Sequence, residues 1–448
     1  MAYINNNKIK GFGGIKRAYL NNTLIFQSFK KDEEVISPYG ITSTFNVTST
    51  TSPTKVCYNT SSFTEMYVDN MQIYPTSAYT FSSTGEHAVQ YMLADKTKIG
   101  YNAFNSCIAL TLVNICDSVT TISSNAFNGC SGLTSVTIPS SVTNIDSYAF
   151  NNCSGLTSID IPSSVISIGV SAFYNTPFYN NLPNGDVYLG RCYYKYKGTM
   201  PSNTSITIKD GTTSISDSAF SGCSGLTSVT IPSSVTSIGD DAFYVCSGLT
   251  SIDIPDSVTT ISMSTFSNCS GLKYIDIPSS VTSIGVKAFY KCSGLTSVTI
   301  PSSVSSIGGY AFGGCASLTA ITLPQNLSSK IGDYTFAGCT SLTEIIIPDG
   351  VPSINGNAVF SGCTSLQKVT IGSGVTSVGT NSFLGAHSIF TGCTSLTEIT
   401  CLAPTAPTLL KKSIQGIENN NGVLYVPYGS DYSTWKSILT TWTIQYLT

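Results

Sequence analysis

The sequence predicts a mainly β solenoid that is built from short, stacked coils. Phenylalanines recur at a period of 23 residues, for example at Phe220, Phe243 and Phe266. One apolar string, CSGLTSVTIPSS, also occurs unchanged at residues 130–141, 223–234 and 292–303. A period of roughly 20–50 residues is typical of architectures in which each unit buries its apolar face only against its neighbours.

Each coil carries the same apolar pattern. Val136 and Ile138 alternate with polar residues, which predicts a short strand with these two side chains pointing inward. Pro139 ends this strand, because it has no N–H group for a sheet. Val142 and Ile145 form a second inward edge. A single coil cannot bury these residues, so we expect the coils to stack.

The period is interrupted between Phe173 and Phe220, over the insertion 174–205. Asn184–Asp186 is a turn signal between apolar runs, and the runs 187–189 and 192–196 predict a hairpin. We expect this hairpin to project from the stack, and the solenoid to resume at Ile206.

Residues 32–98 precede the repeats and contain short alternating runs, such as 41–45, 66–68 and 88–93. Alternation of apolar and polar residues is typical of half-buried strands. We therefore predict a small β domain that leads into the first coil and caps it.

Residues 401–448 depart from the period at the other end. A strand is expected at 424–426 and a short helix at 431–439. Trp435 and Trp442 should cover the last coil, because a solenoid exposes apolar ends unless they are capped.

Composition narrows the class of function. Charged residues are 10% of the chain and the formal net charge is −3, which argues against a nucleic-acid partner. The apolar runs are as short as Ile345–Ile347, so we expect no membrane insertion. No secretory signal peptide is visible in residues 1–29, so ordinary secretion is not expected if Met1 is the true start.

The repeat resembles the BspA-like leucine-rich repeats. Its motif, Ile-Gly-x-x-Ala-Phe-x-x-Cys-x-x-Leu-x-x-Val/Ile-x-Ile-Pro, is complete over residues 238–255, and the resemblance covers residues 99–400. It implies a right-handed leucine-rich-repeat solenoid, which the small N-terminal β domain and a C-terminal α/β cap would flank. Members of this family are commonly surface proteins of gut and oral bacteria, and some occur in protists. The resemblance therefore implies adhesion to host proteins or cells.

A basic arm over residues 1–31 precedes the first acidic residue, Asp32. Such an arm can dock to a partner, and a solvated terminal strand is the alternative. Within it, residues 1–29 resemble short N-terminal segments of phage tail and other virion proteins, through the run from Ile15 to Phe26. The residues that we expect to dock are Lys8, Lys10, Lys16, Arg17, Tyr19 and Phe26.

A virion protein needs no signal peptide, because lysis releases it. The sequence therefore favours a phage virion protein, such as a tail or head fibre or a decoration protein. Its N-terminus would contact other virion proteins, and its repeats would bind a host cell-surface protein or carbohydrate. A homo-oligomer, for example a trimer, is compatible with this role. The alternative is a bacterial BspA-like surface adhesin.

No catalytic or metal site is expected, and no cofactor. The repeated cysteines predict an interior column of free thiols, with disulfides between coils as the alternative. Zinc sites need paired ligands at short spacing, and the chain has no Cys-x-x-Cys. Cys192 lies off the column and is predicted to be exposed. His87 and His387 have no neighbouring nucleophile motif, so we interpret both as structural.

Two surfaces are candidates for binding. The outward strand positions are nearly uniform Ser and Thr, which fits either a spacer or a multivalent carbohydrate-facing surface. The larger side chains at these outward strand positions are Asp160, Asp253, Tyr274 and Asp276. The second candidate is the inserted hairpin, whose aromatic side chains either bind a partner or pack on the solenoid. It contributes Phe178, Tyr179, Tyr188, Arg191, Tyr193, Tyr194 and Tyr196.

Overall fold

A computed structural model describes residues 40–379, 388–409, 414, 416–417 and 420–447. Before residue 40 it describes the backbone of two short antiparallel pairs. These are β1 (Tyr3–Ile4) with β2 (Asn7–Lys8), and β3 (Arg17–Leu20) with β4 (Thr23–Gln27). The chain divides into two compact units, which are described separately. Unit 1 comprises Met1–Val165 and Ser171–Asn181, and unit 2 comprises Ile166–Val170 and Leu182–Thr448.

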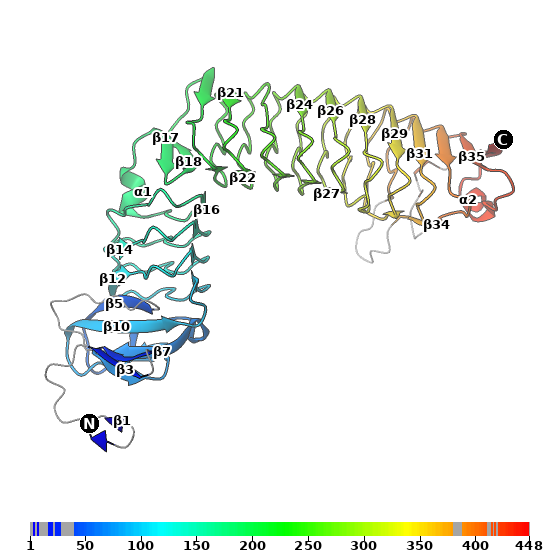
Figure 1. Cartoon of the computed structure of the whole chain (residues 1–448). Helices are drawn as coiled ribbons and strands as arrows, with labels where there is room; N and C mark the ends of the chain where they lie inside the picture. The colour runs from blue at the N-terminus through cyan, green and yellow to red at the C-terminus, as the bar shows by residue number, and fades with distance from the viewer. Residues whose placement is uncertain are drawn as a thin grey trace. The chain divides into compact units, whose positions relative to one another are not determined.

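Unit 1 begins with an antiparallel sheet that becomes a parallel one (Figure 1). β10 (Gly85–Leu93) pairs antiparallel with both β5 (Gly40–Val47) and β7 (Phe63–Val68), and β8 (Met71–Ile73) extends the far edge. On its other side β5 pairs with β12 (Leu110–Asn114) of the first coil. The N-terminal strands thus cap the solenoid by continuing its first sheet, so β12 of the first coil is paired on both sides.

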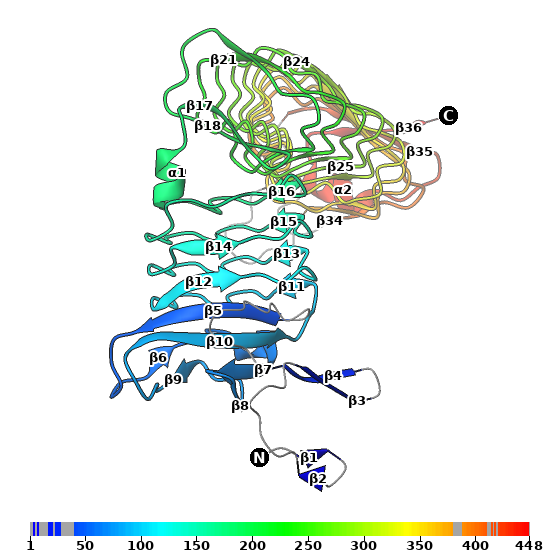
Figure 2. The ribbon, with the colours of Figure 1, turned by 60° about the vertical axis from the view of Figure 1, so that its left-hand side comes forward.

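The coils of unit 1 then stack in parallel, as Figure 2 shows. β12 pairs with β14 (Ser135–Thr137), and a second ladder joins β11 (Lys98–Ile99), β13 (Thr121–Ile122) and β15 (Asn144–Ile145). Smaller elements complete the unit. They are β6 (Thr54–Lys55), η1 (Thr60–Ser62), β9 (Ala78–Tyr79) and α1 (Pro177–Asn181).

Unit 2 starts with the inserted hairpin, which differs from the expectation. β17 (Gly185–Leu189) pairs antiparallel with β18 (Cys192–Lys197), and β18 pairs in parallel with β20 (Ser214–Ile215). The hairpin is therefore a rung of the sheet and does not project. The reason is Tyr193, which is fully buried and stacks on Phe220 with 4.5 Å between ring centroids. Cys192 is likewise buried, so its predicted exposure is wrong.

Two parallel ladders run along the rest of unit 2. The first contains β19 (Thr204–Thr207) with β21 (Leu226–Thr230), then β24 (Tyr274–Asp276), β26 (Ser297–Thr299) and β28 (Ala320–Thr322), and then β29 (Glu344–Ile347), β31 (Lys368–Ile371) and β33 (Glu398–Cys401). The second contains β22 (Ser237–Ile238), which pairs with β20, then β23 (Thr260–Ile261), β25 (Ser283–Ile284) and β27 (Ser306–Ile307), and then β30 (Ser353–Ile354), β32 (Ser377–Val378) and β34 (Thr408–Leu409). A further short strand of unit 2 is β16 (Ser167–Ile168). The predicted mainly β solenoid is confirmed.

The core of each unit is a ladder of stacked phenylalanines. In unit 2, the Phe266 ring lies 5.4 Å from that of Phe243 and 5.6 Å from that of Phe289, with planes within 8° of parallel. A column of free, buried cysteines runs beside the ladder, as predicted. Most of its thiols donate a hydrogen bond to the neighbouring coil: Cys269, for example, donates to the Phe243 carbonyl oxygen at 3.1 Å. The Phe243 carbonyl oxygen also accepts the Cys246 N–H at 3.1 Å, so the thiol adds a link between coils at a carbonyl group that already has a donor.

The corner around each phenylalanine is tight. Asp241 and Val245, two residues before and after Phe243, both have a left-handed backbone, with φ of 54° and 59°. A β-branched residue rarely adopts this region, so the coil-to-coil hydrogen bonds must impose it. The N–H groups of Asp241 and Val245 both donate to the next coil, at 2.9 Å from carbonyl oxygens of Met263 and Ser267.

The C-terminal cap closes the last coil. β35 (Val423–Pro427) pairs in parallel with β33, and β36 (Thr443–Leu447) pairs in parallel with β35, around the short helix α2 (Ser433–Ile438). Trp435 and Trp442 are buried, and their indole N–H groups donate to the carbonyl oxygens of Pro407 and Ile417. The predicted use of both tryptophans as a cover is confirmed.

Candidate functional site

The strand face does not gather its predicted residues into one site. Asp160 is exposed in unit 1, whereas the other three belong to unit 2. Asp253 and Asp276 are neighbours across an isolated parallel bridge, and Tyr274 is 54% exposed on the same face. Two adjacent carboxylates with one tyrosine make a weakly featured surface. A binding role for these residues stays a prediction.

The hairpin aromatics are divided between the two units and are mostly engaged. Phe178 and Tyr179 lie on α1 in unit 1, where the Phe178 ring packs edge-on against Phe173 at 5.3 Å. In unit 2, Tyr193 and Tyr194 are buried, and the Tyr193 hydroxyl donates to Asp186 at 2.8 Å.

Two of the other three hairpin residues, Tyr188 and Arg191, tie β17 and β18 to the segment 209–211 of the next coil. The Tyr188 hydroxyl accepts the backbone N–H of Lys209 at 3.2 Å, and the Lys209 ammonium lies 4.3 Å from the centre of the Tyr188 ring. Arg191 is exposed and donates to the Gly211 carbonyl oxygen. Tyr196 is half-buried. These contacts account for the aromatic residues by packing, and their binding role stays a prediction.

The docking residues expected in the arm fall only in part within the described chain. Lys10 and Lys16 lie outside the described residues, as does His387. Lys8 lies on β2, Arg17 and Tyr19 on β3, and Phe26 on β4. Their docking role stays a prediction.

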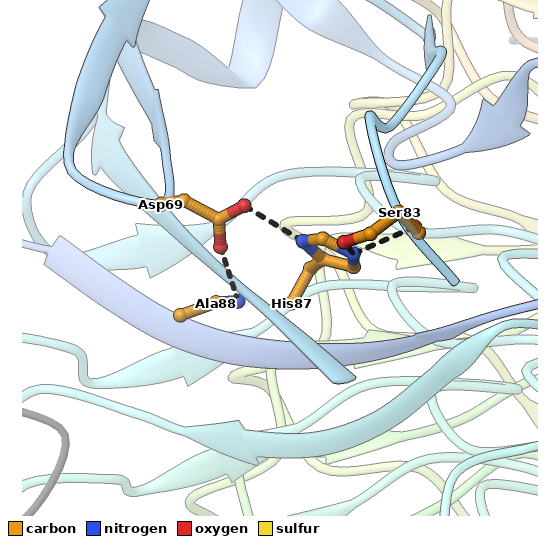
Figure 3. A network of polar contacts seen from close by, with 4 residues as sticks. All are labelled: Asp69, Ser83, His87 and Ala88. Atoms are coloured by element: carbon orange, nitrogen blue, oxygen red, sulfur yellow. Dashed lines mark hydrogen bonds and ion pairs between the residues drawn. The ribbon is translucent and has the colours of Figure 1, made fainter. Parts of the chain in front are cut away.

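A Ser–His–Asp arrangement in unit 1 resembles a catalytic triad at first sight (Figure 3). The His87 Nδ1 atom lies 2.7 Å from the Asp69 carboxylate, and Nε2 lies 3.3 Å from the Ser83 hydroxyl. However, Nε2 is closer to the Ser83 carbonyl oxygen, at 2.9 Å. The Ser83 carbonyl oxygen therefore competes with the Ser83 hydroxyl for the same ring nitrogen, and both partners come from a residue only four positions before His87.

The same network has a structural purpose. Asp69 and Asn70 form the turn between β7 and β8, and both have positive φ. Asp69 accepts the Ala88 N–H of β10 with its second oxygen, at 3.2 Å. His87 is buried against the Phe81 ring. The network therefore fastens a turn and a loop to the central strand of the sheet, as expected for a structural histidine.

The corners of unit 2 form a polar cleft, which we call the corner cleft. It encloses about 380 Å³ and is lined by two rows of residues, those two positions before and one position after the phenylalanines. The lining side chains are Ser218, Asp241, Ser264 and Lys287 from the first row, Ser221, Tyr244, Ser267 and Tyr290 from the second, and Asn268. Aromatic rings, hydroxyls, an amide and both signs of charge thus meet in one hollow.

The tyrosine at one side of the corner cleft is held in place. The Tyr290 ring packs beside Gly313, where an added Cβ would come within 3.3 Å of it. Tyr310 meets the same ring edge-on at 5.8 Å and stacks on Tyr334 at 4.6 Å. The Lys291 ammonium lies 5.2 Å from the centre of the Tyr290 ring. Rigid tyrosines of this kind lose little entropy on binding a partner.

The electrostatics of the corner cleft centre on Asp241. Burial raises the pKa of its carboxyl, and the nearby Asp240 adds to the effect, while a hydrogen bond with Ser264 and the charge of Lys287 oppose it. Next to it, the Asp217 carboxylate accepts the N–H groups of Asp240 at 2.9 Å and Val170 at 3.2 Å. Burial also raises the pKa of Asp217. Asp217 is thus a structural acid, whereas Asp241 faces the hollow.

Sequence reasoning missed the corner cleft because it compared strand positions, whereas the cleft lies at the corners. A signal was present: the residue after the phenylalanine alternates along this stretch, as Ser221, Tyr244, Ser267 and Tyr290.

Two further features of the described residues bear on function. No group of three or more His, Cys, Asp and Glu side chains among them is placed to hold a metal ion. No helix among them is both long and apolar enough to span a membrane.

Comparison with known proteins identifies the repeat. The sequence matches the BspA type leucine rich repeat region in six copies, over residues 76–184, 192–319 and 282–399. No protein of curated function matches. The resemblance of residues 1–29 to virion proteins has no counterpart in these comparisons.

Three solved structures are similar to this chain. One is a leucine rich cell surface protein from Faecalibacterium prausnitzii, with 32% identity and a TM-score of 0.34 over 70% of this chain and 84% of that one. A leucine-rich repeat protein from Bacteroides ovatus has 24% identity and a TM-score of 0.37, and the match covers 83% of this chain and 90% of that one. A leucine-rich repeat protein from T. pallidum has 33% identity and a TM-score of 0.36, over 39% and 82%.

Proposed function

Because the chain belongs to the BspA-type leucine-rich repeat family, we propose that it is a non-enzymatic binding protein that attaches a bacterial surface to a partner. We assign the contact to the corner cleft. The observation that carries this assignment is the convergence of two tyrosines, Asp241 and Lys287 in one hollow of the solenoid. Tyrosine is enriched among the side chains that dominate binding energies.

The other surfaces support the proposal less well. The strand face consists mainly of Ser and Thr, and small hydroxyl side chains rarely dominate binding energies. The hairpin aromatics already have partners within the fold. By contrast, Tyr244 is 39% exposed at the cleft, so part of its ring can contact a ligand without any rearrangement.

The proposed binding role is tested by attachment of the purified chain to host cells. The double variant Tyr244→Ala/Tyr290→Ala removes both rings from the corner cleft. We expect a loss of about 2 kcal/mol or more, or roughly 30-fold in affinity, if these are dominant contacts. Tyr428→Ala, which removes an exposed tyrosine from the C-terminal cap, is the control. Equal attachment by the double variant and the wild type would place the contact elsewhere.

The proposed surface location rests on family membership and needs its own test. Antibodies against the chain should label intact, unpermeabilised cells of the bacterium that produces it. Labelling only after the cells are opened would contradict a surface location. Mass spectrometry of purified phage particles provides the opposite control, since recovery of the chain from particles would favour the virion interpretation.

A further inference from the structure

We propose that the corner cleft binds one pyranose ring of a glycan, seated between Tyr244 and Tyr290. This inference rests on the proposed binding function and specifies its ligand. It follows from the spacing of the two tyrosines, the chemistry of the floor between them and the charges at the rim.

The two tyrosines stand on either side of a coil that carries a small residue at the same position. They occupy the same position in coils two apart, so their Cα atoms are roughly 10 Å apart, which is two strand spacings. The coil between them has Ser267 at this position, and its side chain is buried at the floor. This small residue leaves room between the two tyrosines, and all three residues line the corner cleft.

The floor and rim offer hydrogen bonds suited to sugar hydroxyls. Ser264, Ser267 and Asn268 come from the middle coil, and the Asn268 amide donates to the Ser267 hydroxyl at 3.0 Å. Asp241 provides carboxylate acceptors and Lys287 an ammonium donor. A hydroxyl both donates and accepts, so a pyranose can satisfy groups of either kind at once.

The floor is also held rigid. The backbone N–H of Asn268 donates to the Tyr290 carbonyl oxygen at 2.7 Å. The backbone N–H of Val245 donates to the Ser267 carbonyl oxygen at 2.9 Å. The three coils that bear the two tyrosines and the floor are thus locked to one another. Such a preformed site loses little entropy when it binds a small ring.

Other classes of ligand fit this site less well. The lining contains no aliphatic side chain, so a fatty chain or an apolar peptide anchor would find no dry surface. One lysine beside Asp241 and Asp240 also gives no positive field for a nucleic-acid backbone. A polar peptide is the remaining competitor, and the experiment below distinguishes it.

The full chain is tested by saturation-transfer NMR with methyl glycosides of glucose, galactose, mannose, N-acetylglucosamine and fucose. We expect transfer to at least one glycoside. In Ser267→Tyr the slot is filled by a residue that the neighbouring coils already carry at this position, so the fold should be kept. This variant should weaken binding at least tenfold. Ser361→Tyr, at the same position in a distant coil, is the matched control and should bind like the wild type.

Two results would overturn the inference. One is the absence of transfer to all five glycosides while cell attachment still depends on Tyr244 and Tyr290, which would identify a polar peptide ligand and leave the proposed function standing. The other is equal glycoside binding by Ser267→Tyr and the wild type. Loss of cleft dependence in cell attachment, in contrast, would count against the proposed function itself.

Discussion

Replacing Phe266 with alanine tests the ladder that holds the corner cleft in place. The ring is fully buried, with Phe243 on one face and Phe289 on the other. Truncation of a buried phenylalanine costs about 3–5 kcal/mol, and the two lost ring contacts favour the upper half of that range. The coils that meet at Phe266 are those that bear Tyr244, Ser267 and Tyr290, so the damage should be local to the cleft.

Urea unfolding followed by far-UV circular dichroism measures the loss of unfolding free energy. Because each repeat contacts only its neighbours, hydrogen exchange should show faster opening of residues 240–291 than of the coils near Phe360. The exposed Tyr274→Ala variant should change the free energy by no more than about 0.5 kcal/mol. A loss below about 1 kcal/mol in Phe266→Ala would refute the view that stacked rings stabilise the coils.

Three further predictions follow from the described contacts. All fifteen cysteines are buried, and burial raises the pKa of the Cys292 thiol to about 12. Ellman's reagent should therefore label the native protein slowly, and it should label all fifteen thiols after denaturation. Fast labelling of the native chain would contradict this. Burial raises the pKa of Asp241. Glycoside binding that uses its ionised carboxylate should therefore weaken as the pH falls through that raised pKa, beginning at a higher pH than for an ordinary aspartate. The variant Asp241→Asn should flatten this pH profile of binding. Trp435→Ala removes a buried ring from the C-terminal cap and should cost about 3–5 kcal/mol locally, seen as faster hydrogen exchange in 398–447 with unchanged exchange in unit 1.

Most of the fold could be predicted from the sequence because each coil repeats one apolar pattern. Val136 lies on β14 and Ile138 directly follows it, and both side chains are buried as the alternation indicated. The interior column of cysteines followed from spacing alone, since a small apolar side chain at a repeated position has only the stack to enter. The end tryptophans followed from the need to cover apolar coils.

The hairpin and the cleft could not be predicted in the same way. Tyr193 takes a place beside Phe220 in the ladder, although it interrupts the phenylalanine period. Its hydroxyl remains satisfied by Asp186, a contact that depends on the hairpin's own register. The corner cleft depends on side chains from successive coils that are distant in sequence. A comparison of one repeat position along successive coils indicates a hollow only where a small residue such as Ser267 stands between two large ones.

The most direct test of the account is host-cell attachment of Ser267→Tyr beside Ser361→Tyr, with both variants checked by circular dichroism. The two substitutions are chemically identical and occupy the same position of different coils, so they differ only in whether they fill the corner cleft. The account predicts that Ser267→Tyr attaches at least tenfold more weakly than the wild type, while Ser361→Tyr attaches normally. Equal attachment by the two variants would contradict the claim that the corner cleft is the binding site.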